Sequence, residues 1–249
     1  MPSHVERQLG PHPSPQHPFG RCLSAADSLT QTKKPHRALR EVVYERSRII
    51  GAVREMLARH HASPEAIERG RKRAEAFRAL GYDRIADREG ARRFPTSEKT
   101  KKGNLAEVVL AEYVVAASGL NLPIYRLRYN PNVEQSMKGD DVIAFDLDSK
   151  PVRIIVGEAK FRRTPTTPDV QEIADVLLRS YRVGIPASLQ FIADRLYEQG
   201  RNALAERIDE CTLLFVQQEL RIDYVGLLLS NADVERRVHE GTPMLYVTW

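Results

Sequence analysis

Two carboxylates and one lysine stand on neighbouring apolar runs of the sequence. Asp141 opens the first run, and Glu158 and Lys160 lie near the end of the second. Residues two apart in a strand project from the same face, so Glu158 and Lys160 should share one. Carboxylate oxygens suit Mg²⁺ or Mn²⁺, which lower the pKa of bound water, and an ammonium can stabilise a phosphate under attack. The trio therefore predicts metal-dependent hydrolysis of a phosphodiester bond.

Two further carboxylates belong with this trio. The first is Glu107, which with Glu112 supplies the only charges in the otherwise apolar run from Leu105 to Leu120. A carboxylate in such surroundings is unfavourable unless something compensates its charge, as a metal centre would. Asp140 directly precedes Asp141, and we expect it to be a neighbour of that residue or a substitute for it.

The elements that must position these residues alternate between helices and strands. A helix over 103–118 is apolar on nearly every face and should be buried. The β-branched segments 140–147 and 152–161 should form strands joined by a turn. Further strands are predicted at 124–130, 223–230 and 244–249, and further helices from Thr167 to about Tyr181 and over 186–211. This order predicts an α/β domain in which helices pack on a mixed sheet.

The first hundred residues have a different character. Residues 1–37 are rich in Pro, His and Gly without periodicity, which predicts disorder. A helix is expected over 38–61, and Ser63 and Pro64 are typical of the start of another. The polar stretch 82–102 indicates a linker or exposed loop. The sequence thus divides into a disordered arm (1–37), a basic α-helical region (38–100) and the α/β domain (101–249).

Composition narrows the class of protein. The chain has 249 residues and a net charge of +5, with 22 Lys/Arg against 12 Asp/Glu in residues 1–102 and 16 against 21 in residues 103–249. The basic half could contact a polyanion or an acidic partner, or could be a solvated helical surface. Two distant cysteines indicate a reducing compartment rather than a disulfide framework. No apolar run approaches the ~20 residues of a membrane helix, so we expect a cytoplasmic protein without a membrane partner.

The candidate residues resemble the PD-(D/E)XK nuclease superfamily in order and spacing. The segments that carry the resemblance are Gly139-Asp140-Asp141-Val142-Ile143 and Gly157-Glu158-Ala159-Lys160. The resemblance implies a restriction-endonuclease-like mixed sheet flanked by helices, in which Asp141, Glu158 and the Ala159 backbone carbonyl bind Mg²⁺ or Mn²⁺. It also implies that Lys160 assists the attacking water and that Glu107 completes the metal shell or acts as the base. Asp140 is a further candidate ligand, and the leading Pro of the family motif is absent.

Residues 103–114, 129–141 and 157–161 are similar to one branch of that superfamily, the HamA family of nuclease subunits from Hachiman anti-phage systems. The similarity spans roughly residues 100–230. It implies a deoxyribonuclease that acts on DNA in a complex with a helicase subunit of the HamB kind. The chain has no glycine-rich phosphate loop, so any motor must come from a partner and no bound nucleotide is expected.

Four arginines near the predicted site are candidates for nucleic-acid binding. Arg126 and Arg128 share a face of a predicted strand, and Arg162 and Arg163 directly follow another. Either pair could contact phosphates, or could be solvated charge at the edge of a sheet. The basic helix around 68–78 likewise could hold DNA, dock a partner or have no specific role.

Three functions follow from these observations. The first is a metal-dependent deoxyribonuclease that works as a defence effector under the control of a partner. The second is a non-catalytic DNA- or partner-binding subunit on the same fold, against which the intact Asp141, Glu158 and Lys160 argue. The third is a helical adaptor whose basic N-terminal half is the working part. Mutation of Glu158 separates the first two, since a binding module should keep its function.

Overall fold

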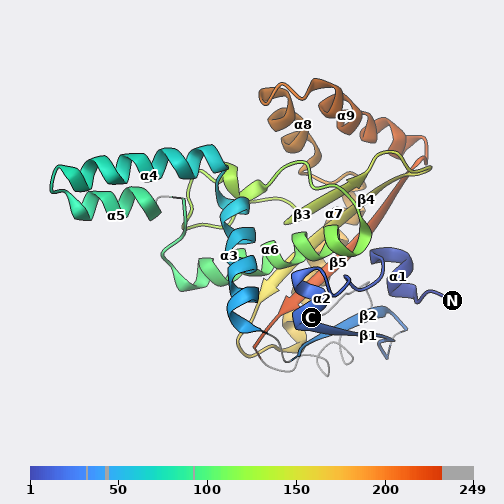
Figure 1. The fold of residues 1–249 in the computed structure, drawn as a ribbon. Helices are drawn as coiled ribbons and strands as arrows, with labels where there is room; N and C mark the ends of the chain where they lie inside the picture. The colour runs from blue at the N-terminus through green and yellow to red at the C-terminus, as the bar shows by residue number, and fades with distance from the viewer. Residues whose placement is uncertain (32, 43–44, 92, 232–249) are drawn as a thin grey trace.

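The computed structural model describes residues 1–31, 33–42, 45–91 and 93–231 (Figure 1). Its helices are α1 (His4–Leu9), α2 (Pro18–Cys22), α3 (Arg46–His61), α4 (Pro64–Ala79), α5 (Asp83–Ala91), α6 (Glu98–Ser118), the 3-10 helix η1 (Arg126–Tyr129), α7 (Thr167–Val183), α8 (Leu189–Glu198) and α9 (Asn202–Val216). Its strands are β1 (Leu23–Leu29), β2 (Pro35–Glu41), β3 (Val142–Asp146), β4 (Val152–Phe161) and β5 (Leu220–Leu229). Within these ranges, none of the helices combines the length and the apolar character needed to cross a bilayer.

Among the described residues, the sheet that carries the candidate residues has three strands and is mixed. β3 pairs antiparallel with β4, and β4 pairs parallel with β5. The predicted α/β class with a mixed sheet is therefore confirmed, as are the elements predicted at β3, β4, β5, α6, α7, α8 and α9. β3 begins with Val142 opposite Gly157, so the last residues of β4, from Glu158 to Phe161, pair with β5 alone. Their other edge has no partner strand in the described chain.

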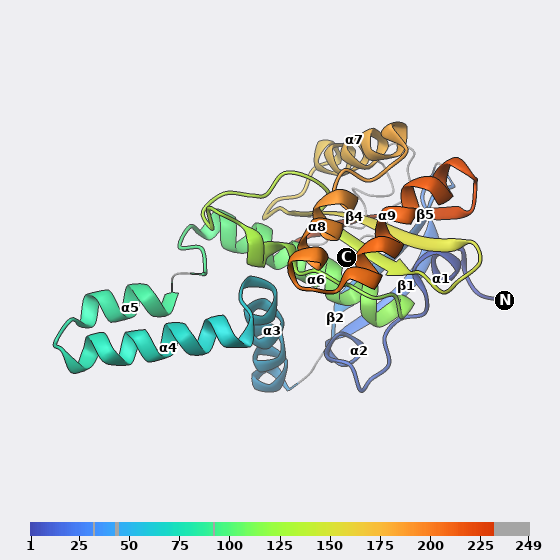
Figure 2. The ribbon, with the colours of Figure 1, turned by 90° about the horizontal axis from the view of Figure 1, so that it is seen from above.

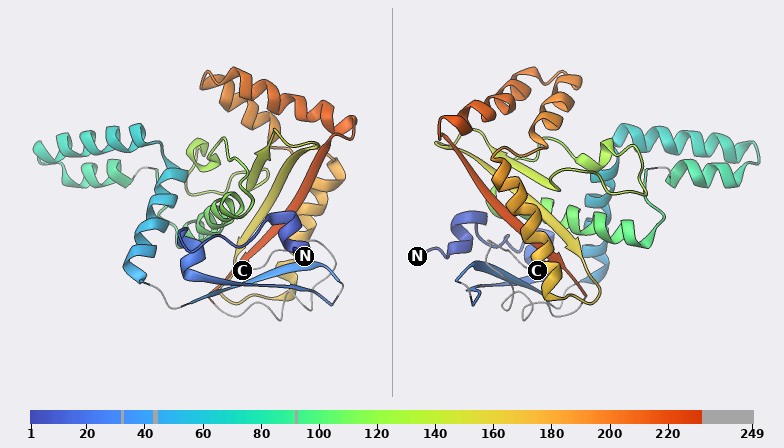
Figure 3. Two further views of the ribbon diagram at one scale, coloured as in Figure 1. Left: turned by 45° about the vertical axis from the view of Figure 1, so that its right-hand side comes forward. Right: turned by 180° about the vertical axis from the view of Figure 1, so that it is seen from behind.

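Successive side chains along each strand point to opposite faces of the sheet, and each face packs against its own apolar layer. Ala144 and Ile155 face the layer that contains α6, whereas Phe145 and Ile154 face the layer that contains α7, α8 and α9. Figure 3 shows α6 and α7 on opposite sides of the sheet. The helix α6 also packs against the N-terminal elements, because Phe19 of α2 belongs to the same layer. Contacts on both sides explain why α6 is apolar on nearly every face.

The described residues among 1–37 are folded against the protein, and the prediction of a disordered arm is wrong for them. The apolar residues of α1 are buried, and the carbonyl of Arg7 accepts a hydrogen bond from Arg221 Nη2 at 3.0 Å. The β1–β2 hairpin is held by the fully buried Arg37, which pairs with Asp27 at 2.6 Å. Arg221 lies 214 residues after Arg7, so Pro and His content alone could not reveal this contact.

The helices α4 and α5 form a hairpin that projects from the rest of the molecule (Figure 2). Ser63 caps α4 through its hydroxyl and Pro64 occupies the first turn, as predicted. The linker predicted at 82–102 is instead largely helical, because it forms α5 and the start of α6. An ion pair between Arg73 and Glu89, 2.9 Å apart, joins the two helices of the hairpin.

Other segments also differ from expectation. The predicted strand at 124–130 contains η1 instead, and the isolated bridge to β3 is formed by Asn121, which precedes this segment. Residues 38–41, predicted as helix, complete β2, where pairing with β1 outweighs local preference. The domain boundary expected near residue 100 falls inside α6. The strand predicted at 244–249 lies outside the described residues.

Candidate active site

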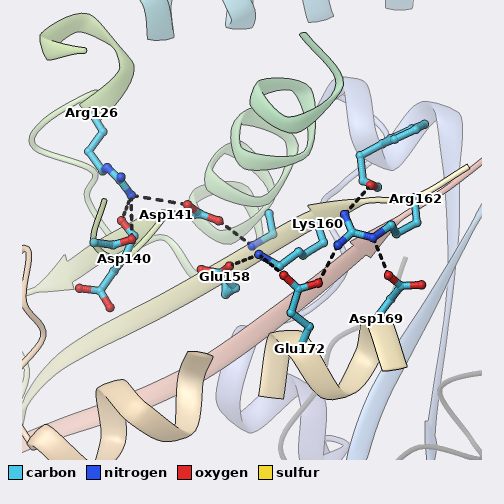
Figure 4. A network of polar contacts seen from close by, with 11 residues as sticks. Arg126, Asp140, Asp141, Glu158, Lys160, Arg162, Asp169 and Glu172 are labelled. Atoms are coloured by element: carbon cyan, nitrogen blue, oxygen red, sulfur yellow. Dashed lines mark hydrogen bonds and ion pairs between the residues drawn. The ribbon is translucent and has the colours of Figure 1, made fainter. Parts of the chain in front are cut away.

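The candidate carboxylates meet at the free edge of β4 (Figure 4). Asp141 Oδ2 accepts a hydrogen bond from the backbone N–H of Ala159 at 2.9 Å. Glu158 lies close enough to Asp141 for the two carboxyl groups to influence each other's pKa. The N–H and C=O of one strand residue point to the same edge, so the Ala159 carbonyl also faces this space. The structure thus brings Asp141, Glu158 and the Ala159 carbonyl together.

Lys160 lies beside Glu158 on the same face of β4. Its Nζ donates to Glu158 Oε1 at 2.8 Å and lies 3.5 Å from Glu172 Oε1 of α7. Burial disfavours the ammonium, but these carboxylates outweigh burial and raise the pKa of Lys160. The lysine is therefore held as a positive charge next to the acidic pair.

Glu107 reaches the same region from α6. Burial, with further repulsion from Asp141 and Glu158, raises the pKa of Glu107 to about 8. Burial and the charge of Asp141 raise the pKa of Glu158 to about 7, against the opposing effect of Lys160. Burial also raises the pKa of Asp141, although the positive charge of Arg126 opposes it. Three carboxyl groups thus compete for ionisation in one desolvated region, which favours a cation among them.

Gly157 determines how closely α6 approaches the sheet. A Cβ on Gly157 would lie 2.8 Å from Leu110 Cδ2 and 3.1 Å from Val142 Cβ. Leu110 follows Glu107 by one helical turn, so both residues lie on one face of α6. The absence of a side chain at Gly157 therefore lets α6 bring Glu107 towards the carboxylates of the sheet.

A buried arginine fixes the loop that carries Asp141. Arg126, only 7% exposed, donates hydrogen bonds to the carbonyls of residues 138–140 and lies 3.6 Å from Asp141 Oδ1. Gly139 adopts φ = +103°, and a Cβ there would lie 2.7 Å from Ser188 Oγ. Both the backbone conformation and the space thus require glycine at this position. Arg126 was a candidate for DNA binding, but its guanidinium is occupied inside the protein.

Asp140 is not brought to the site. Its carboxylate accepts hydrogen bonds from Ser180 Oγ at 3.1 Å and from the Ser188 N–H at 3.2 Å. Its own N–H donates to Ser188 Oγ at 3.0 Å. Asp140 therefore ties the start of β3 to α7 and α8, while Asp141 faces Glu158.

The other arginine candidates occupy different environments. Arg162 is paired with Asp169 at 2.5 Å and with Glu172 at 2.6 Å, whereas Arg163 is exposed. Arg128 lies over the Tyr125 ring, 4.5 Å from its centre. Of the four, only Arg163 presents an exposed side chain.

Two residues of the site escaped prediction. Glu172 contacts both Lys160 and Arg162, but its helix could not be placed relative to the sheet from sequence alone. The only available signal was the predicted helix start at Thr167, which places Glu172 in the second turn. His60, which carries no functional signal in the sequence, lines the same small cavity as Glu107 and Asp141. It is buried there and its Nε2 lies 2.7 Å from Glu112 Oε1.

The donor set fits a hard divalent cation. Across the described ranges, no three His, Cys, Asp or Glu side chains are arranged as a complete ligand cage. Mg²⁺ does not need one, since it commonly binds through one or two carboxylates and fills its shell with water and phosphate oxygens. Asp141, Glu158 and the Ala159 carbonyl provide oxygen donors of that kind. A cation beside them would also relieve the repulsion that raises the pKa of Glu107 and Glu158.

Comparison with known proteins covers nearly the whole chain. The model of the HamA family matches residues 19–242. The chain is 36% identical over 226 residues to the Hachiman protein HamA of Bacillus cereus, an alignment that covers 91% of this chain and 80% of that protein. The match begins far before residue 100, so it includes the helices α3, α4 and α5 as well as both strands of the candidate site. The chain belongs to the HamA family.

Proposed function

We propose that this protein is a metal-dependent deoxyribonuclease and the effector subunit of an anti-phage defence complex. One observation carries the proposal: Asp141 and Glu158 meet beside Lys160 at the free edge of β4. The same groups, in the same order, form the motif by which the chain resembles PD-(D/E)XK nucleases. Membership of the HamA family supports a role in Hachiman defence.

Asp141, Glu158 and the Ala159 carbonyl are the groups that would hold Mg²⁺ or Mn²⁺. Such an ion, when bound, stabilises charge on a phosphate and acidifies a water molecule. Lys160 orients the attacking water and neutralises charge on the phosphate, while Glu158 and Glu172 keep its ammonium in place.

Glu107 is the candidate base. The resemblance implies this role, and burial raises the pKa of Glu107, which makes its carboxylate a stronger proton acceptor than an exposed one. The reaction is an in-line displacement, in which a water oxygen bonds to phosphorus and the ester oxygen of the strand leaves.

A partner would supply the motor. The chain carries no glycine-rich phosphate loop, and the resemblance to HamA implies a helicase subunit. The net positive charge of residues 1–102 supports contact with DNA or with an acidic surface of that subunit.

The test is cleavage of supercoiled plasmid by the purified chain with Mg²⁺ or Mn²⁺. Glu158→Gln removes one charge without changing shape, and Glu206→Gln on the exposed face of α9 is the matched control. We expect cleavage to vanish in EDTA and to fall at least about 100-fold in Glu158→Gln. Glu206→Gln should cleave as the unaltered chain does.

If the chain alone leaves DNA intact, the assay is repeated with the helicase complex, and phage survival is measured in cells. Protection of cells by Glu158→Gln, or intact DNA in the presence of the complex, would overturn the nuclease. The function would then be that of a non-catalytic DNA- or partner-binding subunit on the same fold.

A further inference from the structure

A second cavity opens beside the candidate site. It has a volume of about 390 Å³ and lies between the segment 121–129, the end of β3 and the helix α9. This volume is within the range of roughly 300–1,000 Å³ typical of small-ligand pockets. It shares Leu122, Ile124 and Tyr125 with the small cavity beside Glu107 and Asp141, so the two cavities flank one stretch of chain.

The cavity has an apolar floor. The half-buried side chains of Leu122, Leu147 and Leu204 line it, together with the buried Phe145 and Ile208. The rings of Tyr125 and Tyr129 complete the lining on one side. A flat, apolar body would therefore find contact area here.

Three arginines stand on the rim of the cavity, and only one has an acidic partner. Arg207 pairs with Asp148 at 2.7 Å, but the side chain of Asp148 is 89% exposed. Arg128 and Arg201 donate to backbone carbonyls, and neither has a carboxylate within 4.0 Å among the residues that the structure describes. The rim thus carries more positive than negative charge, which favours an anion, and guanidinium groups match phosphate geometry well.

Two amide side chains also lie on the rim. Gln199 donates to the Tyr129 hydroxyl at 2.5 Å, and the side chain of Asn121 is exposed at the opening. Amides can both donate and accept hydrogen bonds, so they suit the polar edge of a nucleobase. The apolar floor suits the flat ring of a nucleobase, the amide groups suit its polar edge, and the guanidinium groups suit a phosphate. A nucleotide contains all three parts.

We propose that this cavity binds a nucleotide, with its base on the apolar floor and its phosphate among Arg128, Arg201 and Arg207. The lack of a glycine-rich loop led to the expectation that no nucleotide binds. This pocket would hold phosphate by side-chain guanidinium groups, not by the backbone N–H groups of such a loop. The nucleotide is either a free molecule or one unit of a nucleic-acid strand. Binding requires neither cleavage nor a metal, so it stands apart from the proposed nuclease.

The proposal is tested by calorimetry on the full chain in EDTA. The probes are deoxyadenosine monophosphate, deoxyadenosine and inorganic phosphate. We expect the monophosphate to bind with a Kd below about 1 mM, and each of the other two at least about tenfold more weakly. A 5′-phosphorylated tetranucleotide distinguishes the sources: tighter binding than the monophosphate assigns a strand, and equal or weaker binding assigns a free nucleotide.

Variants connect the binding to this cavity. Arg201→Gln and Arg128→Gln should each weaken monophosphate binding at least about fivefold. Arg182→Gln, an exposed arginine of α7 outside the cavity, should not. Leu204→Trp, which fills part of the cavity, should abolish binding in a protein whose circular dichroism is unchanged. Glu158→Gln should bind normally even though it cannot cleave.

The proposal is overturned if the monophosphate does not bind at about 5 mM. It is also overturned if deoxyadenosine binds equally well, since the arginines would then contribute nothing. Equal losses in Arg201→Gln and Arg182→Gln would likewise place the binding elsewhere.

Discussion

The carboxylate of Asp141 accepts a hydrogen bond from the backbone N–H of Ala159, 2.9 Å away, where β3 has not yet begun and β4 continues beyond it. The acid thereby takes the place that a strand residue would have occupied on the edge of β4. A peptide donor that would otherwise be unpaired now orients a carboxylate. The site is therefore built into the end of the sheet rather than on a separate loop.

Asp141→Asn should separate the structural role of this residue, its hydrogen bond with the Ala159 N–H, from the role of its negative charge in cleavage. The amide oxygen can still accept the Ala159 N–H, but the negative charge is gone. We expect Mg²⁺-dependent plasmid cleavage to fall at least about 100-fold while thermal unfolding in EDTA stays unchanged or rises slightly. Asp194→Asn, on an exposed face of α8, is the control. Cleavage at the normal rate by Asp141→Asn would show that the charge has no catalytic role.

Glu107→Gln should change how stability depends on pH. The pKa values of about 8 for Glu107 and about 7 for Glu158 lie above the ordinary 4.5, so the folded chain binds protons more tightly than the unfolded chain. Without metal, the contribution of these two groups to the free energy of unfolding must therefore decrease as pH rises from about 5 to 8. The variant should unfold about 2–4 °C above the unaltered chain at pH 8, and the difference should shrink towards pH 5.

The measurement is thermal unfolding in EDTA at several pH values, with Glu206→Gln as control. Buried histidines such as His60, whose pKa is lowered mainly by burial, destabilise the fold in acid. They act equally in both proteins and cancel in the comparison. Identical pH slopes for Glu107→Gln and the unaltered chain would contradict the raised pKa of Glu107.

Gly157→Ala should push α6 away from the sheet. The new methyl would meet Leu110 at 2.8 Å, so we expect a loss of about 1–3 kcal/mol in the free energy of unfolding. Cleavage should also fall, because Glu107 moves with the helix. Gly103→Ala is the matched control within α6, since a Cβ there meets nothing within 4 Å. It should stabilise the helix by about 0.5–1 kcal/mol, and an equal effect of both variants would refute the packing argument.

Arg126→Lys should lower the stability of the protein, whereas Arg163→Ala should weaken DNA binding and leave stability unchanged. The buried guanidinium of Arg126 serves several carbonyls, which one ammonium cannot all reach, so the lysine variant should lose about 1–3 kcal/mol of stability. Arg163 is exposed, so its removal should leave unfolding unchanged and weaken DNA binding mainly at low salt. Chemical denaturation and filter binding at several salt concentrations measure both. A normal midpoint for Arg126→Lys would return Arg126 to the list of possible phosphate contacts.

Deletion of residues 1–10 should destabilise the whole chain. Val5 and Leu9 are buried, and removing α1 exposes the core that they cover. We expect a decrease of several degrees in the unfolding temperature, since each 1 kcal/mol corresponds to about 2–4 °C in a chain of this size. Deletion of residues 1–2, which leaves α1 intact, is the control. No change in the longer deletion would restore the interpretation of a free arm.

The sequence could predict the pairing of Glu158 with Lys160 because a strand has a fixed period of two. The same rule says that Asp140 and Asp141 point in opposite directions, but not which of them faces the site. That choice depends on Gly139, whose positive φ and contact with Ser188 set the direction of the turn.

Residues outside regular periodicity were harder to predict. Arg126 stands in a short 3-10 helix, and its role follows from a loop 12–14 residues later in the chain. Glu172 lies on a helix that the sequence did predict, yet a helix can pack on a sheet at many rotations. The helix α1 is hydrogen-bonded to strands that follow over a hundred residues later, so the local composition around it was misleading.

The hydrogen bond from Arg221 to the carbonyl of Arg7 joins residues 214 positions apart. A ribosome adds roughly 5–20 residues per second, so α1 is synthesised tens of seconds before β5, the strand that donates this hydrogen bond. The end of β4 is also unpaired during this time, because beyond Gly157 its only partner in the described sheet is β5, which ends at Leu229. A nascent chain therefore lacks a finished edge until β5 has been synthesised. Whatever reaction that edge performs can begin only after Leu229 has left the ribosome.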